Sequence, residues 1–209
     1  MSSPATARHL RADAERSVRT ILEAAERVLS VDPAASMEQI AEAAGVARTT
    51  IHRRFTTRQA LLDAMAEAAV AQLRAVIEEG RPETAPPLVA LHEITASVLR
   101  TKISWRFAFD LPAAPGSPAD EGQRDVVRRC LELFARARDL GLLAPDADLE
   151  WTRRVYYALI GEASRGDDAG TDPDALAARV IDTLLHGAGP RDQSAASGGS
   201  GNGWAPFQA

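Results

Sequence analysis

Cysteine and long apolar runs are almost absent from the sequence, and each absence excludes a class of protein. Cys130 is the single cysteine among 209 residues, so no internal disulfide can form and a reducing cytoplasm is favoured. No stretch approaches the ~20 apolar residues of a membrane-spanning helix, and the N-terminus lacks the apolar core of a signal peptide. We therefore expect a cytoplasmic protein that neither crosses a membrane nor is secreted.

The residue patterns of metal sites and of common catalytic motifs are missing as well. The four histidines are scattered, at His9, His52, His92 and His186, without the close spacing that metal ligands require. No GxSxG, P-loop or GxGxxG motif occurs, and the glycine-rich segment 198–201 follows no strand and is of low complexity. The sequence therefore predicts no enzyme, no metal site and no other cofactor.

Acidic residues are absent from Ala43 to Leu62, although the whole chain carries a net charge of −5. The basic groups of this acid-free segment are Arg48, His52, Arg53, Arg54 and Arg58. Residues 1–62 hold 9 arginines against 7 acids, for +2, whereas residues 63–209 hold 15 basic and 22 acidic residues, for −7. This local excess of positive charge indicates a polyanionic partner, and the acidic remainder should face solvent, a partner subunit or a ligand.

The same region carries the signals of two short helices joined by a tight turn. Ser36 and Gln39 have the spacing of a capping box, in which each side chain pairs with a free backbone N–H of the new helix. An apolar stripe follows at three- and four-residue steps, formed by Met37, Ile40, Ala41 and Ala44. Gly45 is the residue best able to take the positive φ that ends a helix, and Val46 is the apolar residue that such turns bury.

The second of these helices, from Ala47 to Phe55, is too polar to belong to a core. Only Ile51 and Phe55 can turn inward beside Val46, which leaves the rest of the circumference to polar and basic side chains. We interpret this helix as a device that enters the major groove of DNA. The alternative is a solvated arginine face on an ordinary helical hairpin. The missing acids, the tight turn and the helix caps together favour DNA.

A third helix is predicted to start where Thr56 and Gln59 repeat the capping-box spacing, which places Thr57 and Arg58 at an N-terminus that favours phosphate. Arg48 and Thr49, at the start of the preceding helix, are expected to read base edges. The residues expected to hold phosphates include Thr50, His52 and Arg58. The complete predicted DNA-binding set is Arg48, Thr49, Thr50, His52, Arg53, Arg54, Thr57 and Arg58.

The segment reads IAEAAGV, then a short helix that ends in Phe55, then a polar N-cap, the basic Arg58 and the residues ALL. This arrangement resembles the DNA-binding domain of tetracycline-repressor (TetR) family regulators and covers about the first third of the chain. Where the family often has Ser, Tyr and Lys, this chain has Ala47, His52 and Arg58. Arg58 keeps the charge, whereas His52 is shorter than Tyr and titrates near neutrality.

Beyond this region the apolar pattern predicts helices and no competing strand, so we expect an all-α protein of about nine helices. Residues 1–57 are expected to form the helix-turn-helix domain, with a mobile arm over Met1 to Ala12, and residues 58–80 a connecting helix. Residues 81–188 are expected to form an effector-binding and dimerisation domain. Disorder is expected in the low-complexity tail 189–209, with docking of its WAPF segment on a groove as the alternative.

The resemblance implies a homodimer formed through the last two long helices, near Asp148 to Gly166 and Asp172 to His186. It also implies a small apolar effector enclosed among the middle helices. The residues expected to line such a cavity are His92, Trp105, Phe107, Phe109, Cys130, Phe134, Tyr156 and Tyr157. Each of them could equally be ordinary core. Cys130 is expected to be a small buried hydrophobe rather than a redox sensor.

The predicted function is a DNA-binding transcriptional regulator, specifically a repressor that a small apolar effector releases from a palindromic double-stranded operator. The helix from Arg58 to Glu79 is expected to carry a tilt from the effector to the recognition helices. The alternative is an all-α binding or interaction protein whose helix-turn-helix is vestigial or faces another protein. Electrophoretic mobility of genomic DNA at two salt concentrations separates these functions, because salt-sensitive binding is expected of the first alone.

Overall fold

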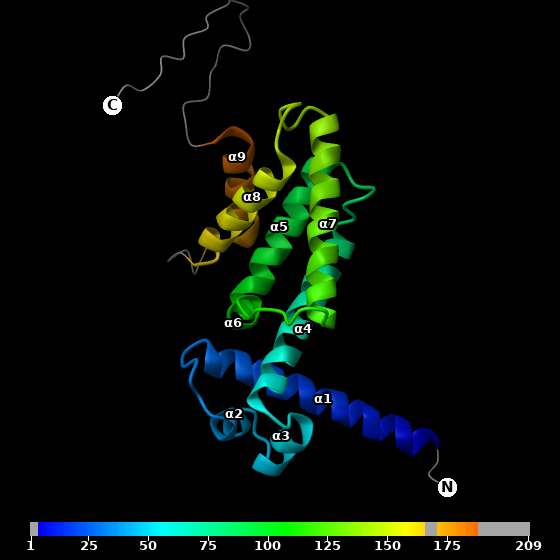
Figure 1. The fold of residues 1–209 in the computed structure, drawn as a ribbon, viewed down its shortest axis with the longest axis vertical. Coiled ribbons are helices and arrows are strands. Elements are labelled where there is room, and N and C mark those ends of the chain that lie inside the picture. Colours follow the sequence, from blue (N-terminus) through cyan, green and yellow to red (C-terminus); the bar gives the residue numbers. More distant parts are fainter. Residues whose placement is uncertain (1–3, 166–170, 188–209) are drawn as a thin grey trace, which may run out of the picture.

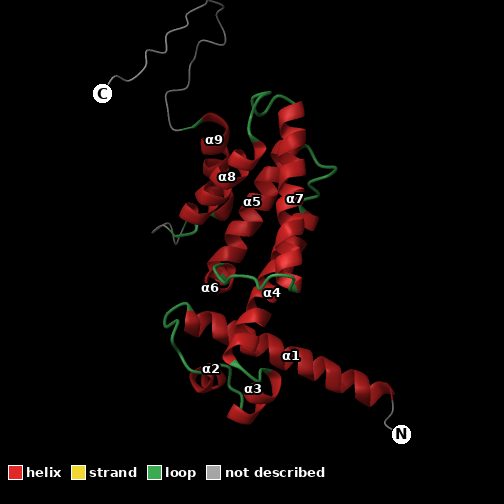
Figure 2. Ribbon diagram, in the orientation of Figure 1, coloured by secondary structure: helices red, strands yellow, loops and turns green. Residues whose placement is uncertain are grey.

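The computed structural model describes residues 4–165 and 171–187, and within these residues it contains nine α-helices. Figure 2 shows helices and loops and no strand in this part of the chain. The all-α prediction is confirmed. The helices are α1 (Pro4–Leu29), α2 (Met37–Ala43), α3 (Arg48–Arg54), α4 (Arg58–Glu79), α5 (Pro87–Ser104), α6 (Arg106–Phe109), α7 (Pro118–Asp139), α8 (Leu149–Ala163) and α9 (Pro173–His186).

The buried apolar residues of the described chain form two large cores and a small third cluster of Ala66, Val70 and Ala119. Helices α1 to α3 and the first half of α4 enclose the smaller core, whose fully buried side chains include Ile21, Ile40 and Ile51. The end of α4 and helices α5, α7, α8 and α9 enclose the larger one, around Leu91 and Phe134. Figure 1 shows α1 to α3 at one end of an elongated molecule and α5 and α7 to α9 at the other, with α4 running between them. The basic helix and the larger core therefore lie in different parts of the fold.

Helix α4 belongs to both cores. It has 22 residues and is therefore about 33 Å long, as the sequence predicts. Leu61 and Met65 are buried in the smaller core, and Ile77 is buried in the larger one. Against α7 it packs closely: a Cβ added to Gly122 would lie 2.4 Å from the Val70 side chain. Helix α4 therefore forms a continuous structural connection between the two cores.

The helix boundaries differ from the sequence prediction in two places. Residues 4–12, predicted as part of a mobile arm, form the start of α1, so that prediction is wrong for them. Pro4 is compatible with this start because the first helical position needs no backbone N–H. The N-cap of α4 is Thr57 rather than Thr56: the Thr57 hydroxyl accepts the Ala60 backbone N–H at 3.0 Å. The tail segment with its WAPF sequence lies outside the described residues.

Candidate functional site

The turn between α2 and α3 has the geometry that its sequence predicts. At the start of α2, the Ser36 backbone N–H donates to Gln39 Oε1 at 2.7 Å, and the Gln39 N–H donates to the Ser36 hydroxyl at 3.2 Å. At its end, Gly45 takes a φ of 67° and donates to the Glu42 carbonyl, while the Val46 N–H donates to the Ala41 carbonyl, both at 3.0 Å. These two bonds close a Schellman motif, which fixes the angle at which α3 leaves the turn.

Helix α3 is anchored by two apolar residues and turns its other side to solvent. Ile51 is fully buried, and Phe55, which follows the helix, is 6% exposed. Arg48, Thr49, His52 and Arg53 are exposed and Thr50 is half-buried; we call these five residues the recognition face. Five residues from one short helix thus present hydrogen-bond donors and two guanidinium groups on a single exposed surface.

One carboxylate stands beside the recognition face. His52 Nε2 lies 3.4 Å from Oε1 of Glu38, which belongs to α2. Hydrogen bonds from the Glu38 backbone N–H, and then from His52, lower the pKa of the Glu38 carboxyl. Both side chains are about half exposed, so solvent weakens this pair. His52 therefore has a local partner that any phosphate must compete with.

Two of the remaining predicted DNA-binding residues, Arg58 and Arg54, contact other parts of the protein. The Arg58 guanidinium donates to the carbonyl of Ala35 and, at 2.7 Å, to that of Pro33, which ties the start of α4 to the loop before α2. The half-buried Arg54 lines a crevice between α1 and α4, and its buried Nε has no hydrogen-bond partner in the described part of the chain. The DNA contacts of all eight predicted residues stay predictions, and for Arg54 and Arg58 the structure adds contacts within the protein.

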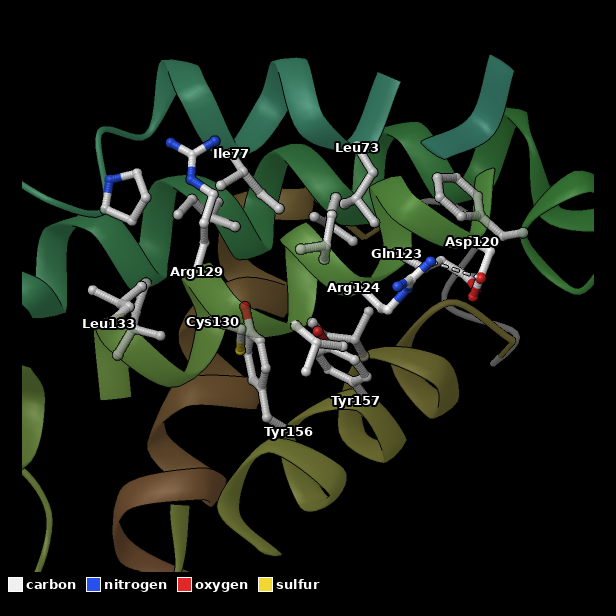
Figure 3. Close-up of a pocket in the computed structure, with 18 residues that line it drawn as sticks. Leu73, Ile77, Asp120, Gln123, Arg124, Arg129, Cys130, Leu133, Tyr156 and Tyr157 are labelled. Atoms are coloured by element: carbon white, nitrogen blue, oxygen red, sulfur yellow. Dashed lines mark hydrogen bonds and ion pairs between the residues drawn. The ribbon is translucent and has the colours of Figure 1, made fainter. Parts of the chain in front are cut away.

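A cavity of about 520 Å³ lies in the larger core among α4, α5, α7 and α8. Figure 3 shows its walls: Leu73 and Ile77 come from α4, Cys130 and Leu133 from α7, and the tyrosines from α8. The apolar lining residues are Leu73, Ile77, Pro82, Leu91, Ile94, Val98, Phe109, Val126, Val127, Leu133 and Ile160. A space of this size, mostly apolar and with a few polar groups, has the character of a small-molecule site.

Four of the eight predicted cavity residues line this space: Phe109, Cys130, Tyr156 and Tyr157. Phe134 is fully buried behind it, with its ring edge-on to Tyr156 at 5.5 Å between centroids. Trp105 and Phe107 pack instead against the smaller core, and His92 is half-buried outside the lining. Aromatic character alone did not distinguish the residues that line the cavity from those that do not. Most of the wall is aliphatic, and these aliphatic residues belong to the apolar stripes of α4, α5 and α7.

The charged groups at the cavity wall are neutralised by their neighbours. Arg124 pairs with Asp120 at 3.0 Å. Arg129, which is 9% exposed, pairs with Glu83 at 2.8 Å and with Glu78 at 3.0 Å. The bond with Glu83 raises the pKa of Arg129 and lowers that of the Glu83 carboxyl. Each arginine at the cavity wall therefore already has a carboxylate partner.

The thiol and the two tyrosine hydroxyls of the cavity wall are neutral at physiological pH. Burial raises the pKa of the Cys130 thiol from 9.0 to about 12. Burial also raises the pKa of Tyr156, whose hydroxyl is 2.7 Å from the Thr95 hydroxyl, and that of Tyr157. The thiol is therefore a small apolar wall group rather than a nucleophile.

A helix-turn-helix with an exposed basic recognition face, joined by one continuous helix to a cavity-bearing helical body, defines the class of helical DNA-binding regulators. The profile of the family described as "Bacterial regulatory proteins, tetR family" matches residues 21–65. The HTH-type transcriptional repressor LfrR of Mycolicibacterium smegmatis is 30% identical over 174 residues, which is 83% of this chain and 90% of that protein. The chain belongs to the TetR family of transcriptional regulators, so it regulates transcription rather than catalysing a reaction.

Solved structures agree with this assignment. LfrR from Mycobacterium smegmatis in complex with proflavine has a TM-score of 0.65 and 29% identity, and the match covers 82% of this chain and 96% of that one. PfmR from Thermus thermophilus, with a TM-score of 0.70 and 18% identity over 81% of this chain and 99% of that one, shares the fold. Among the described residues, no helix is long and apolar enough to cross a membrane, and no cluster of three potential metal ligands occurs.

Proposed function

We propose that the protein is a dimeric repressor, acting in the cytoplasm, that an apolar small molecule releases from a palindromic operator. The observation that carries this proposal is the course of α4. Leu73 and Ile77 of this helix line the cavity, whereas Leu61 and Met65 belong to the core that supports α3. An occupant that displaces α4 therefore changes the separation of two recognition helices. That separation must match half-sites that lie about 34–36 Å, or a multiple of this distance, apart.

The proposed dimer uses the outer faces of α8 and α9. Trp151 of α8 is 57% exposed, with the Arg154 guanidinium 5.0 Å from the centre of its ring. A large aromatic side chain is costly to leave in water and is enriched at interfaces. A two-fold dimer then implies an operator with matching symmetry. Light scattering at micromolar concentration should give about twice the monomer mass of 22.3 kDa, and Trp151→Glu should shift it towards one monomer.

The proposed effector is an apolar, largely aromatic and uncharged molecule. The guanidinium and carboxylate groups at the wall already have partners, and the tyrosines and the thiol are neutral. We therefore choose the neutral fluorophore N-phenyl-1-naphthylamine as the first probe, because it is aromatic and carries no charge that would draw it to DNA.

The test begins with DNA fragments selected from the genome by the protein itself. Their affinity, measured by fluorescence anisotropy, should fall steeply with salt, because bound phosphates release counterions. Addition of N-phenyl-1-naphthylamine should weaken that affinity. The matched control is Val127→Phe, which fills the cavity and leaves the recognition face untouched: it should bind the same DNA and ignore the probe. A chain that selects no DNA at low salt would support the interaction-protein alternative.

A further inference from the structure

A buried carboxylate of α1 caps α6, a helix of the predicted effector-binding domain. Glu26 of α1 is 4% exposed, and each of its oxygens accepts one backbone N–H from α6: Phe107 donates to Oε1 at 2.6 Å and Ala108 donates to Oε2 at 2.9 Å. The Ser30 hydroxyl adds a third bond to Oε1 at 2.9 Å. Helix α6 has no side-chain cap of its own, because the residue at its N-cap is Trp105. Glu26 of α1 therefore supplies the N-terminal cap that no side chain next to α6 provides.

These bonds are expensive to break. A carboxylate removed from water is tolerated only where hydrogen bonds replace its hydration, and two amide donors at a helix start are well suited to that purpose. If α6 moved away from α1, one buried anion and two backbone N–H groups would lose their partners together. Helix α6 and helix α1 are thus expected either to move as one body or to separate in a single step.

The same four-residue helix also reaches the cavity. Phe109 lines the cavity wall, while Ala108, its neighbour, is 2% exposed in the smaller core, and Phe107 packs against that core. Figure 1 shows α6 at the junction of the two regions, above α1 and beside α4. Phe109 is thus one and two residues away from the Ala108 and Phe107 amides that donate to Glu26, so a displacement of Phe109 should disturb these hydrogen bonds. Helix α4 is not the sole route between the cavity and the recognition face.

We propose that Glu26 is a positioning residue whose bonds to α6 couple the state of the cavity to the orientation of the DNA-binding region. This inference rests on the proposed function, and it adds a second connection, through α1, to the one that α4 provides. Coupling between two sites is reciprocal. The hydrogen bonds between Glu26 and α6 must therefore respond when DNA binds at the other end of the molecule, even with the cavity unchanged.

The test is hydrogen–deuterium exchange of the segment from Trp105 to Leu111, with and without the DNA fragment selected by the wild-type protein. In the wild-type protein, exchange of the Phe107 and Ala108 amides should change by about fivefold or more on DNA binding. Glu26→Gln keeps the size of the side chain but leaves one acceptor oxygen for two donors. It should still bind DNA and should lose that response. The matched control Ser30→Ala removes the third bond alone and should respond as the wild type does.

The outcomes separate the two proposals. A wild-type protein that binds DNA without any change in the exchange of this segment overturns the role of Glu26 and leaves the proposed function intact. A response of wild-type size in folded Glu26→Gln overturns it as well. If the variant does not fold, the wild-type comparison decides alone. A protein that binds no DNA defeats the proposed function itself, and with it this inference.

Discussion

The recognition face and the cavity wall differ in whether their charged side chains have partners. Arg48 and Arg53 are exposed, and neither forms an ion pair within the described part of the chain. Around the cavity, Arg124 and Arg129 are paired, and burial keeps the Cys130 thiol neutral. Hydrated charge without a partner suits a polyanion, whereas a neutral apolar wall suits an uncharged ligand. The contrast assigns two different partners to two ends of one chain.

The largest expected effect concerns the neutral end. A thiol pKa near 12 instead of 9.0 reduces the thiolate fraction at pH 8 by about a thousandfold. Iodoacetamide should therefore modify folded Cys130 about a thousandfold more slowly than the urea-unfolded chain, as followed by mass spectrometry. Equal rates in the folded and unfolded chains would show that the wall is open to water and the thiol ionised.

The next effect concerns the charged end. Arg48→Ala should cost about 1–3 kcal/mol of operator binding and relax the sequence preference at one position in each half-site, because a guanidinium at the start of a recognition helix reads a base edge. Arg128→Ala on α7 is the matched control, since that arginine is already paired with Asp125 and Glu132. Anisotropy titrations should show no loss for the control. An equal loss in both variants would contradict the assignment.

A phosphate contact should behave differently from a base contact. His52→Ala should weaken all DNA sequences about equally and reduce the slope of log affinity against log salt by up to about one. The neighbouring Glu38 competes with phosphate for His52, so Glu38→Gln should strengthen binding modestly. Salt titrations on the selected DNA and on random DNA measure both effects. Altered sequence preference in His52→Ala would instead place this residue on a base.

The two ends should also respond when the helix between them is displaced. Gly122→Ala places a Cβ 2.4 Å from a Val70 methyl group, so either the Val70 side chain must turn or α4 must shift relative to α7, at a cost of about 1–3 kcal/mol in stability. Operator affinity should fall although no residue of the recognition face has changed. Urea denaturation and anisotropy measure the two quantities. Unchanged operator affinity in this variant would show that the position of α4 does not affect the recognition face.

The smallest expected effect is the pH dependence of the stability that the Arg129–Glu83 ion pair contributes. The hydrogen bond from Arg129 lowers the pKa of the Glu83 carboxyl in the folded protein below 4.5, its value in the unfolded chain. The pair therefore stabilises the fold fully above pH 4.5, and this stabilisation is lost as the pH falls through the lower pKa of the folded protein. Because Glu83 is half exposed, the contribution should stay below about 1 kcal/mol. Thermal melts between pH 7 and pH 3 should therefore show a slightly shallower acid decline in Glu83→Gln. An identical decline would mean that the pair contributes no stability.

Much of the architecture could be predicted from local signals. Ser36 caps α2 as the sequence predicts, because a cap is decided within one turn of the chain. The start of α1 was missed because residues 4–12 carry no clear apolar period. Such a period is the main signal of an amphipathic helix.

The site residues were less predictable, since their roles depend on contacts between distant segments. Arg58 appears in the sequence as a phosphate ligand, yet its guanidinium bonds the Pro33 carbonyl, 25 residues away. Trp105 and Phe107 appear as cavity aromatics, yet α6 directs them to the other core. Glu26 gives no sequence signal of its partners, which lie 81 and 82 residues further along the chain.

The most direct test of the account is the linkage between the two ends. Operator affinity is measured with and without N-phenyl-1-naphthylamine, and the affinity for this probe is measured with and without operator, on the same dimer. Both affinities should fall by the same factor, within the ~5–150-fold typical of allosteric coupling, and Val127→Phe should abolish the effect. Stoichiometric binding of the probe to the cavity with no change in operator affinity would contradict the account and leave the larger core as a dimerisation platform.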